Sequence, residues 1–269
     1  MPELPEVETT LRGIEPHVCG QKIDRSHVRI ASLRWPISAE VAGLAGREII
    51  GVSRRAKYIL MQLDQGHLIW HLGMSGSMRV LPCHSPVERH EHVELELANG
   101  MSLKFRDPRR FGALLYCDEN PLEHRLLLPL GPEPLSDEFT ADYLYQQCRR
   151  RSAPIKTIIM NGHIVVGVGN IYACEALFQA GIRPQCAASK ISKARIAVLV
   201  ERIKITLAAA ILQGGTTLQD FTQVDGKPGY FTQSLMVYAN KGQCNVCNKT
   251  IKKITQAQRS SYYCPGCQT

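Results

Sequence analysis

The chain of 269 residues contains 44% hydrophobic and 21% charged residues, ordinary values for a folded globular protein, which exclude a largely disordered chain. No apolar run approaches the roughly 18 residues of a membrane span, and the N-terminus lacks the apolar core of a signal peptide. We therefore expect a cytoplasmic protein without membrane contact, and its net charge of +8 suits an anionic polymer as partner.

The N-terminal residues carry a candidate nucleophile, because a methionine that precedes proline is normally removed and leaves Pro2 with a free secondary amine. An α-amino group titrates near ~7.7–8.0, so a neutral fraction exists at physiological pH. A secondary amine that attacks an aldehyde carbon gives an iminium ion directly, the strategy that lysines use in Schiff-base enzymes. Glu3 is one residue away, where its carboxylate can move protons.

A helix is expected to begin close to this amine, since Val7, Leu11 and Ile14 have helical spacing and Pro5 suits a first turn. The positive end of that helix disfavours an ammonium ion and so favours the nucleophilic form of the amine. The alternative is that Pro2 only starts the helix and that the neighbouring glutamates complement the helix dipole.

Strands dominate the residues from 21 to about 116. Residues 92–97 alternate strictly between polar and apolar, and Asn99 with the following glycine predicts a hairpin turn into a partner strand over 101–106. Residues 58–63 have apolar side chains at alternate positions, and Lys57 extends that inward face. Lys57 is then either a surface residue whose stem lies along the sheet or a desolvated, reactive amine.

Two glycine-containing loops punctuate the strands, one carrying Met74 and the other carrying Arg109 and Phe111. Apolar tips beside arginines suit a protein that inserts side chains between stacked bases. The alternative is that Met74 and Phe111 fill the core and that the arginines pair with Asp107.

The segment 130–134, rich in glycine and proline, is the clearest linker, and the pattern beyond it is helical. We expect helices over residues 137–147, 154–160, 170–180 and 191–212. Asn170 is well placed to cap the third of these helices, whose first amides would bind a DNA phosphate. The alternatives are an ordinary cap here, a solvated face for the arginine run 149–151, and a plain connector or a mobile lid over 216–230.

The C-terminal cysteines form a strong zinc signature. Cys244 and Cys247 are followed, after sixteen residues, by Cys264 and Cys267. Four thiolates fill a tetrahedral site and leave no position for water, so we expect one structural zinc ion. The other six of the ten cysteines are scattered, a pattern that fits a reduced cytosol. Basic residues between the pairs, Arg259 among them, suggest a finger that contacts nucleic acid.

Taken together, seven motifs resemble the bacterial formamidopyrimidine-DNA glycosylase family, over essentially the whole chain. They are PELPEVET at 2–9, RRAKY at 54–58, HLGMSG at 71–76, DPRRFG at 107–112, VGVGNIYA at 166–173, GGTTL at 214–218 and the terminal cysteine pairs. The resemblance implies a multidomain α+β fold. Residues 1–131 would form a catalytic domain of one N-terminal helix plus a β-sandwich. Residues 132–234 would form a helix–two-turn–helix DNA-binding domain with a lesion lid, and 235–269 a zinc finger.

The resemblance also implies an activity. The family excises 8-oxoguanine and ring-opened purines from duplex DNA and then cuts the abasic strand by β,δ-elimination. Pro2 matches the Schiff-base nucleophile that attacks the sugar C1′, and Glu3 matches the acid/base carboxylate. Lys57 matches the proton donor for β-elimination, and Arg259 matches the donor for δ-elimination.

Further matches concern DNA binding. Met74, Arg109 and Phe111 match the trio that fills the gap left by the everted nucleotide, with Arg109 facing the orphaned cytosine. The remaining matches to DNA contacts are His90, Arg109, Arg151, and Asn170 with Arg259 as a phosphate clamp. One departure is Gln219, since family members often carry a basic residue in the lid at this point.

Two other functions compete with this interpretation. Enzymes resembling endonuclease eight prefer oxidised pyrimidines, but that branch usually has glycine where this chain has Leu4, and it commonly lacks the Met–Arg–Phe trio. A non-catalytic binder of damaged DNA would need neither Pro2, Glu3 nor Lys57. We therefore expect a monomeric enzyme that acts on double-stranded DNA containing oxidised bases.

Overall fold

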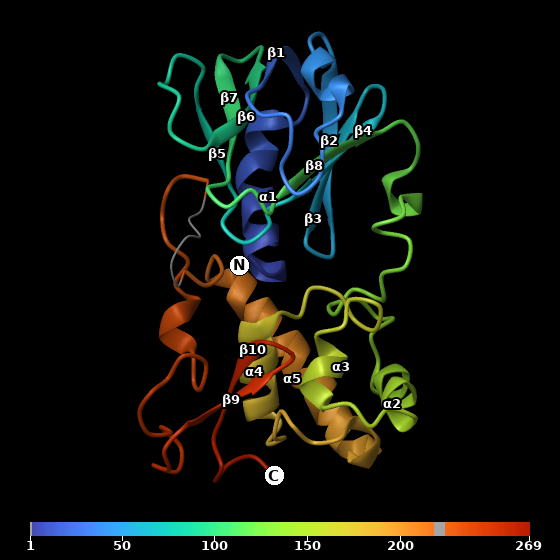
Figure 1. The fold of residues 1–269 in the computed structure, drawn as a ribbon, viewed down its shortest axis with the longest axis vertical. Coiled ribbons are helices and arrows are strands. Elements are labelled where there is room, and N and C mark those ends of the chain that lie inside the picture. Colours follow the sequence, from blue (N-terminus) through green and yellow to red (C-terminus); the bar gives the residue numbers. More distant parts are fainter. Residues whose placement is uncertain (1, 218–223) are drawn as a thin grey trace. The chain divides into compact units, whose positions relative to one another are not determined.

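A computed structural model describes residues 2–217 and 224–269, which form two compact units (Figure 1). Unit 1 comprises Met1–Leu128 and Gln213–Thr232, and unit 2 comprises Pro129–Leu212 and Gln233–Thr269. The division into domains at 131/132 and 234/235 stays a prediction. Among the described residues, no helix is long and apolar enough to cross a membrane.

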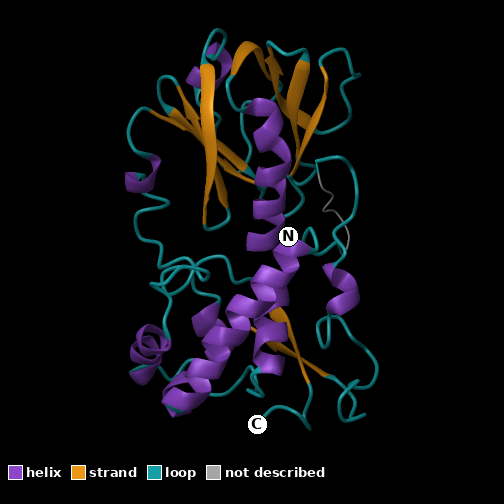
Figure 2. Ribbon diagram, turned by 180° about the vertical axis from the view of Figure 1, so that it is seen from behind, coloured by secondary structure: helices purple, strands orange, loops and turns teal. Residues whose placement is uncertain are grey.

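Unit 1 is built around helix α1 (Leu4–Val18), which begins where the proline and the apolar spacing predict. Its buried face includes Val7, Leu11 and Ile14, and each such side chain contributes roughly 1.5–3 kcal/mol when fully buried. The helix contacts strands from both halves of the sheet and lies between them (Figures 1 and 2). This core fixes the position of the helix N-terminus.

The sheet of unit 1 is antiparallel, with the order β5-β7-β6-β1-β2-β3-β4-β8. The strands are β1 (Gln21–Val28), β2 (Glu48–Arg55), β3 (Tyr58–Leu63), β4 (His67–His71), β5 (Ser77–Pro82), β6 (Glu91–Leu97), β7 (Met101–Arg106) and β8 (Ala113–Cys117), with 3-10 turns η1 (Ala39–Gly43) and η2 (Pro121–Glu123). Strand β1 belongs to both halves, because its first residues pair with β2 and the rest pair with β6. The predicted combination of a helix and a two-layered sheet is confirmed.

The predicted hairpin is present, since β6 and β7 pair and the turn glycine Gly100 has a φ of 78°. Ile59, Met61 and Leu63 of β3 face the core, as predicted. Lys57 is not part of that row. It lies in the turn before β3, directly after Ala56, whose φ is 55°.

Unit 2 is helical and ends in a two-stranded hairpin (Figure 1). Its elements are α2 (Ala141–Arg149), α3 (Ile155–Ile159), α4 (Asn170–Gln179), η3 (Ala188–Lys190), α5 (Lys193–Leu212), β9 (Lys252–Gln256) and β10 (Arg259–Tyr263); the turn η4 (Phe231–Ser234) lies where the chain passes from unit 1 to unit 2.

One predicted helix start and one predicted cap in unit 2 were wrong. Helix α2 begins at Ala141 rather than residue 137, because the Thr140 hydroxyl accepts a hydrogen bond from the amide of Tyr143 and caps the helix there. Asn170 does not cap α4. Gly169 is the capping residue, and Asn170 is the first helical residue, so its side chain is available for other contacts.

Candidate active site and nucleic-acid interface

The N-terminal segment is buried and held by a capping box. Pro2 lies directly before α1, and the amide of Glu3 donates to Oε2 of Glu6 at 2.7 Å. Oε1 of Glu6 accepts the amide of Thr216 at 2.8 Å, which ties the start of α1 to the 214–217 segment. Gly215 allows this approach, because a Cβ there would lie 3.0 Å from Oε1 of Glu6. Glu6 therefore fixes the backbone beside Pro2.

The turn that carries Lys57 is anchored to the same helix. Arg54 donates to Glu8 of α1 at 2.8 Å and to the carbonyl of Ala56 at 2.9 Å. Burial opposes ionisation of Glu8, but the hydrogen bonds from Arg54 and Arg12 outweigh it and hold the pKa of that carboxyl below its usual range. An ion pair on α1 thus determines where the Lys57 turn lies.

Two cationic side chains, Lys57 and Arg34, lie near His71 in unit 1 and form a cationic cluster. Burial first, and the nearby charges of Lys57 and Arg34 second, lower the pKa of His71 to about 4. The ring is therefore neutral at pH 7, and its Nδ1 accepts the amide of Gly73 at 3.0 Å. A cavity of about 540 Å³ adjoins this cluster. It is lined by Leu33, Arg34, His71, Gly73, Met74, Arg110 and Phe111.

The residues of the predicted DNA-inserting trio are exposed or half-buried, and two of them, Met74 and Phe111, line this cavity. Phe111 is 46% exposed, so the alternative that it fills the core is wrong. The guanidinium carbon of Arg109 lies 5.1 Å from the centre of the Phe111 ring, and Met74 is half-buried. Unit 1 thus brings these three side chains to neighbouring loops. His90 is half-buried, lies directly before β6 and has a φ of 71°.

In unit 2, a buried lysine joins helices α3 and α4 to the hairpin. Lys156 is 2% exposed, and its ammonium donates to Oδ1 of Asn170 at 2.5 Å, to Oγ of Ser261 at 2.7 Å and to the carbonyl of Ser260 at 3.2 Å. Nδ2 of Asn170 donates to the Ser260 carbonyl at 3.0 Å and to the Tyr238 hydroxyl at 3.3 Å. This network orients Asn170, a residue that the sequence analysis identified, through Lys156, a residue that it did not identify.

Glu175 fixes the segment that leads into the finger. Its carboxylate is 1% exposed and accepts the backbone amides of Met236, Val237 and Tyr238 at 2.7–3.0 Å. Burial raises the pKa of Glu175, against the lowering effect of these three amides. A lone glutamate within an apolar helix was the sequence signal for this role.

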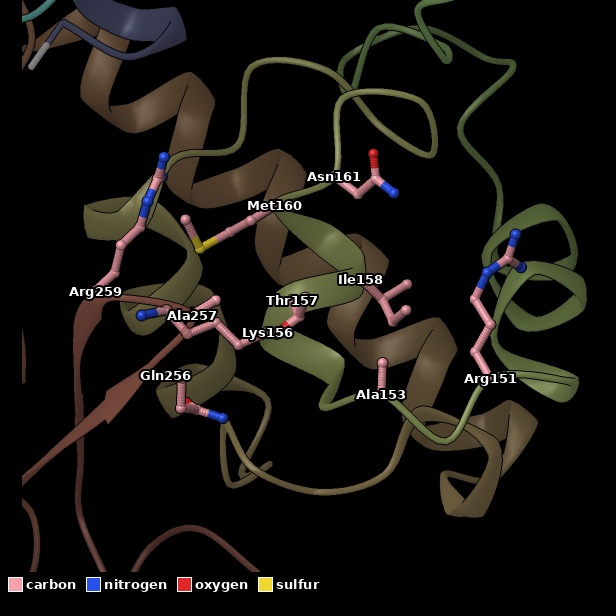
Figure 3. Close-up of a pocket in the computed structure, with 10 residues that line it drawn as sticks. All are labelled: Arg151, Ala153, Lys156, Thr157, Ile158, Met160, Asn161, Gln256, Ala257 and Arg259. Carbon is pink, nitrogen blue, oxygen red and sulfur yellow. The ribbon is translucent and has the colours of Figure 1, made fainter.

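Arg151 and Arg259 lie on opposite sides of the residues that line a cavity of about 510 Å³ in unit 2 (Figure 3). Both side chains are exposed, and Thr157 and Asn161 line the cavity as well. Arg259 is the first residue of β10, directly after a tight turn in which Gln258 has a φ of 61°. Two guanidinium groups around a hollow suit a phosphate backbone.

The four cysteines of the predicted zinc site converge, with sulfur atoms within 4.8 Å of one another. The amide of Cys267 donates to the sulfur of Cys264 at 3.4 Å, which orients the thiol as in metal-binding turns. Four sulfur ligands and no open position fit one structural zinc ion, as predicted. In the described part of the chain this is the one such cluster. Cys244 and Cys264 also pack against Phe178 of α4.

Comparisons with known proteins cover the whole chain. Family models match at residues 1–114 (formamidopyrimidine-DNA glycosylase N-terminal domain), 130–222 (formamidopyrimidine-DNA glycosylase H2TH domain) and 243–269 (zinc finger found in FPG and IleRS). The chain is 55% identical to a formamidopyrimidine-DNA glycosylase of Pseudomonas paraeruginosa and 53% identical to one of Escherichia coli, with all of each chain covered.

Solved structures are similar as well. A complex between the Lactococcus lactis Fpg and DNA containing an abasic site has a TM-score of 0.93 and 31% identity. A complex of the same organism's protein with DNA containing an N7-benzyl-Fapy-dG has a TM-score of 0.92 and 32% identity. Each match covers 100% of both chains.

Proposed function

The chain belongs to the formamidopyrimidine-DNA glycosylase family, and from that premise we propose that it excises oxidised purines from duplex DNA and then cleaves the abasic strand. The substrates are 8-oxoguanine and formamidopyrimidines, and the protein acts as a monomer in the cytoplasm, on the nucleoid when engaged. The full-length match to curated glycosylases and to protein–DNA complexes supports this proposal.

Pro2 is the proposed nucleophile. With the initiator methionine removed, its secondary amine attacks C1′ of the damaged nucleotide, the base leaves with a proton, and the opened sugar is held as an iminium ion. The amine adjoins the positive end of α1, which favours its neutral form. Glu3, 2% exposed and fixed by the capping box, is the proposed acid/base group for the sugar and the leaving base.

Strand cleavage then needs two eliminations. Loss of a proton from C2′ of the iminium expels the 3′-phosphate, and a second elimination expels the 5′-phosphate. Lys57 is the proposed proton donor for the first step and Arg259 for the second, while Arg259 and Asn170 also bind a phosphate. The anchoring of the Lys57 turn to α1 through Arg54 supports the first assignment.

Recognition requires the damaged nucleotide to leave the stack, at a cost of a few kcal/mol. Met74, Arg109 and Phe111 are proposed to fill the resulting gap, with Arg109 facing the unpaired cytosine. His90 and Arg151 are proposed to bind DNA as well. Gln219, at the position where relatives often have a basic residue, lies outside the described residues.

The observation that carries the proposal is the buried Pro2–Glu3 pair at the start of α1 in a chain that matches this family over its full length. Borohydride trapping tests it. The protein should become covalently linked to a duplex containing 8-oxoguanine opposite cytosine, and react more slowly with thymine glycol. Binding without trapping would indicate a damage reader, and preference for thymine glycol would indicate the pyrimidine-specific branch.

A further inference from the structure

Asp107 is a buried carboxylate that the proposed mechanism does not use. It is 0% exposed and comes directly before the loop that carries Arg109 and Phe111. Oδ1 accepts the Ser75 hydroxyl at 2.8 Å and the Arg109 amide at 3.3 Å, and Oδ2 accepts the Gly112 amide at 2.7 Å. Its carboxylate therefore joins two loops that are more than thirty residues apart in sequence.

The Ser75 hydroxyl makes the connection tighter. Besides donating to Asp107, its oxygen accepts the amide of Arg109 at 3.2 Å. Ser75 follows Met74 directly in the chain. Met74, which provides one of the inserted side chains, is therefore linked by a single peptide bond to the residue that holds loop 107–112.

The backbone of Asp107 connects these two loops to β6. Its amide donates to the carbonyl of His90 at 3.0 Å, and its carbonyl accepts Nε2 of His92 at 2.9 Å. Both loops and the His90 backbone are thus fixed to one residue.

Close backbone contact leaves the two loops no room to move separately. A Cβ at Gly73 would lie 2.4 Å from the Gly112 amide nitrogen, and a Cβ at Gly112 would lie 2.9 Å from Oδ2 of Asp107. Gly73 also has a φ of 66°, and Arg110, between Arg109 and Phe111, has a φ of 55°. Such conformations persist where the surrounding contacts enforce them.

We propose that Asp107 and Ser75 are positioning residues that clamp loops 72–76 and 107–112 into one rigid unit. Met74, Arg109 and Phe111 then enter the duplex together, and their backbone is ordered before DNA binds. This inference rests on the proposed role of that trio. The Asp107 carboxylate accepts hydroxyl and backbone donors, while the Arg109 guanidinium lies over the Phe111 ring and stays exposed to face the opposite base.

Four variants test the clamp. Ser75→Ala removes the hydroxyl, Ser75→Thr keeps it, and Asp107→Asn removes the charge and one acceptor. Ser77→Ala is the matched control, because Ser77 is a buried serine two residues away on β5, outside both loops. Hydrogen exchange of the free proteins should show protected amides at Arg109 and Gly112 in the parent, Ser75→Thr and Ser77→Ala, and faster exchange in Ser75→Ala and Asp107→Asn.

Single-turnover excision of 8-oxoguanine opposite cytosine and opposite adenine supplies the functional measurement. Ser75→Ala and Asp107→Asn should slow excision opposite cytosine on the order of tenfold and reduce the preference for cytosine over adenine. Cleavage of a preformed abasic site, which requires no damaged base to be everted, should fall by less. A merely structural role would lower all three rates together.

The outcomes separate the inference from the proposed function. If Ser75→Ala leaves both exchange and the cytosine preference unchanged, the clamp is overturned, whether or not Asp107→Asn folds. If Met74→Ala, Arg109→Ala and Phe111→Ala also leave excision unchanged, the proposed role of the trio fails as well. Loss in these three with no loss in the clamp variants overturns the clamp alone.

Discussion

The two proposed DNA-contacting regions are each organised by one buried charged side chain, but the charges are opposite. In unit 1, the Asp107 carboxylate collects amides and a hydroxyl from loops 72–76 and 107–112. In unit 2, the Lys156 ammonium donates to oxygen atoms of Asn170, Ser260 and Ser261. A buried charge is tolerated in each place because hydrogen bonds surround it.

The difference lies in what each region needs from outside the chain. The loops of unit 1 are held by hydrogen bonds and glycine contacts within the protein alone. The hairpin of unit 2 joins Lys156 through Ser261, and its fold depends on four cysteines that hold zinc. The two regions should therefore fail under different conditions.

The largest effect is expected from a change in neither region. Pro2→Glu should keep Met1, because methionine is removed only before a small side chain, so the nitrogen of residue 2 stays an amide. Both DNA-contacting regions remain intact, and borohydride trapping should fall by at least about 10⁴-fold while DNA binding persists. Pro2→Gly keeps a primary amine and should retain weak trapping. Equal trapping by the two variants would show that the amine at this position is not the nucleophile.

Zinc removal should separate the two regions. Chelation, or Cys244→Ala, should unfold the hairpin, because the metal contributes on the order of 10 kcal/mol to folding of such small sites. DNA affinity should drop by about 100-fold or more as the phosphate contacts of unit 2 are lost. Hydrogen exchange at Gly112 should stay slow, since the loops of unit 1 contain no metal ligand.

Restoring zinc should restore binding, and Cys83→Ala serves as the control because Cys83 lies outside the cluster. Full DNA affinity in the metal-free protein would show that the finger does not contribute to binding.

Lys156→Met tests the cation at the centre of unit 2. The substitution keeps most of the side-chain volume but leaves the Ser261 hydroxyl and Asn170 without their charged donor. The free energy of unfolding should therefore fall by about 2–3 kcal/mol. DNA affinity should fall through misplacement of Asn170. Arg149→Ala is the control, because Arg149 is an exposed cation over Tyr145 and takes no part in this network.

Chemical denaturation measures the first effect and binding titrations measure the second. A variant as stable as the parent would mean that the ammonium and its hydrogen bonds contribute nothing net, and that Asn170 is held by its other contacts.

Much of the fold was predictable because its signals are local. Alternation over residues 92–97, the Asn99–Gly100 turn and the four paired cysteines each determine their own structure, and the structure confirms all three. The loop motifs also placed Met74, Arg109 and Phe111 correctly at exposed or half-buried positions. The catalytic roles of the site residues stay predictions.

The supporting residues were missed because their roles depend on tertiary contacts. Nothing local predicts that Lys156 is buried between two helices and a hairpin, or that Asp107 accepts amides from its own loop and a hydroxyl from another. The left-handed backbone conformation at His90 and Arg110 could not be predicted either, since in a sequence only glycine indicates such a conformation. Asn170 was mispredicted as a cap because a neighbouring glycine, Gly169, fills that position and frees the amide.

The smallest expected effect, and the one that distinguishes the regions by pH, concerns His71. Its folded-state pKa of about 4 lies below the ordinary value of 6.5, so the unfolded chain binds a proton first as the pH falls. The stability that His71 contributes is complete above pH 6.5 and is lost progressively as the pH falls through about 4. Protonation would also remove the acceptor for the Gly73 amide at the base of loop 72–76.

Urea unfolding at pH 7.5 and pH 5 measures this loss. Between these values the parent should lose about 1–2 kcal/mol on account of His71, the lower figure applying because the ring keeps some solvent contact. His71→Gln cannot titrate and should lose correspondingly less, whereas His17→Gln, at an exposed helix end, should behave like the parent. Because His71 lies in unit 1, the protection factor of the Gly73 amide should fall at pH 5 before the Asn170 network of unit 2 changes. Identical pH dependence in the parent and His71→Gln would mean that this ring is not what couples acid to the loops.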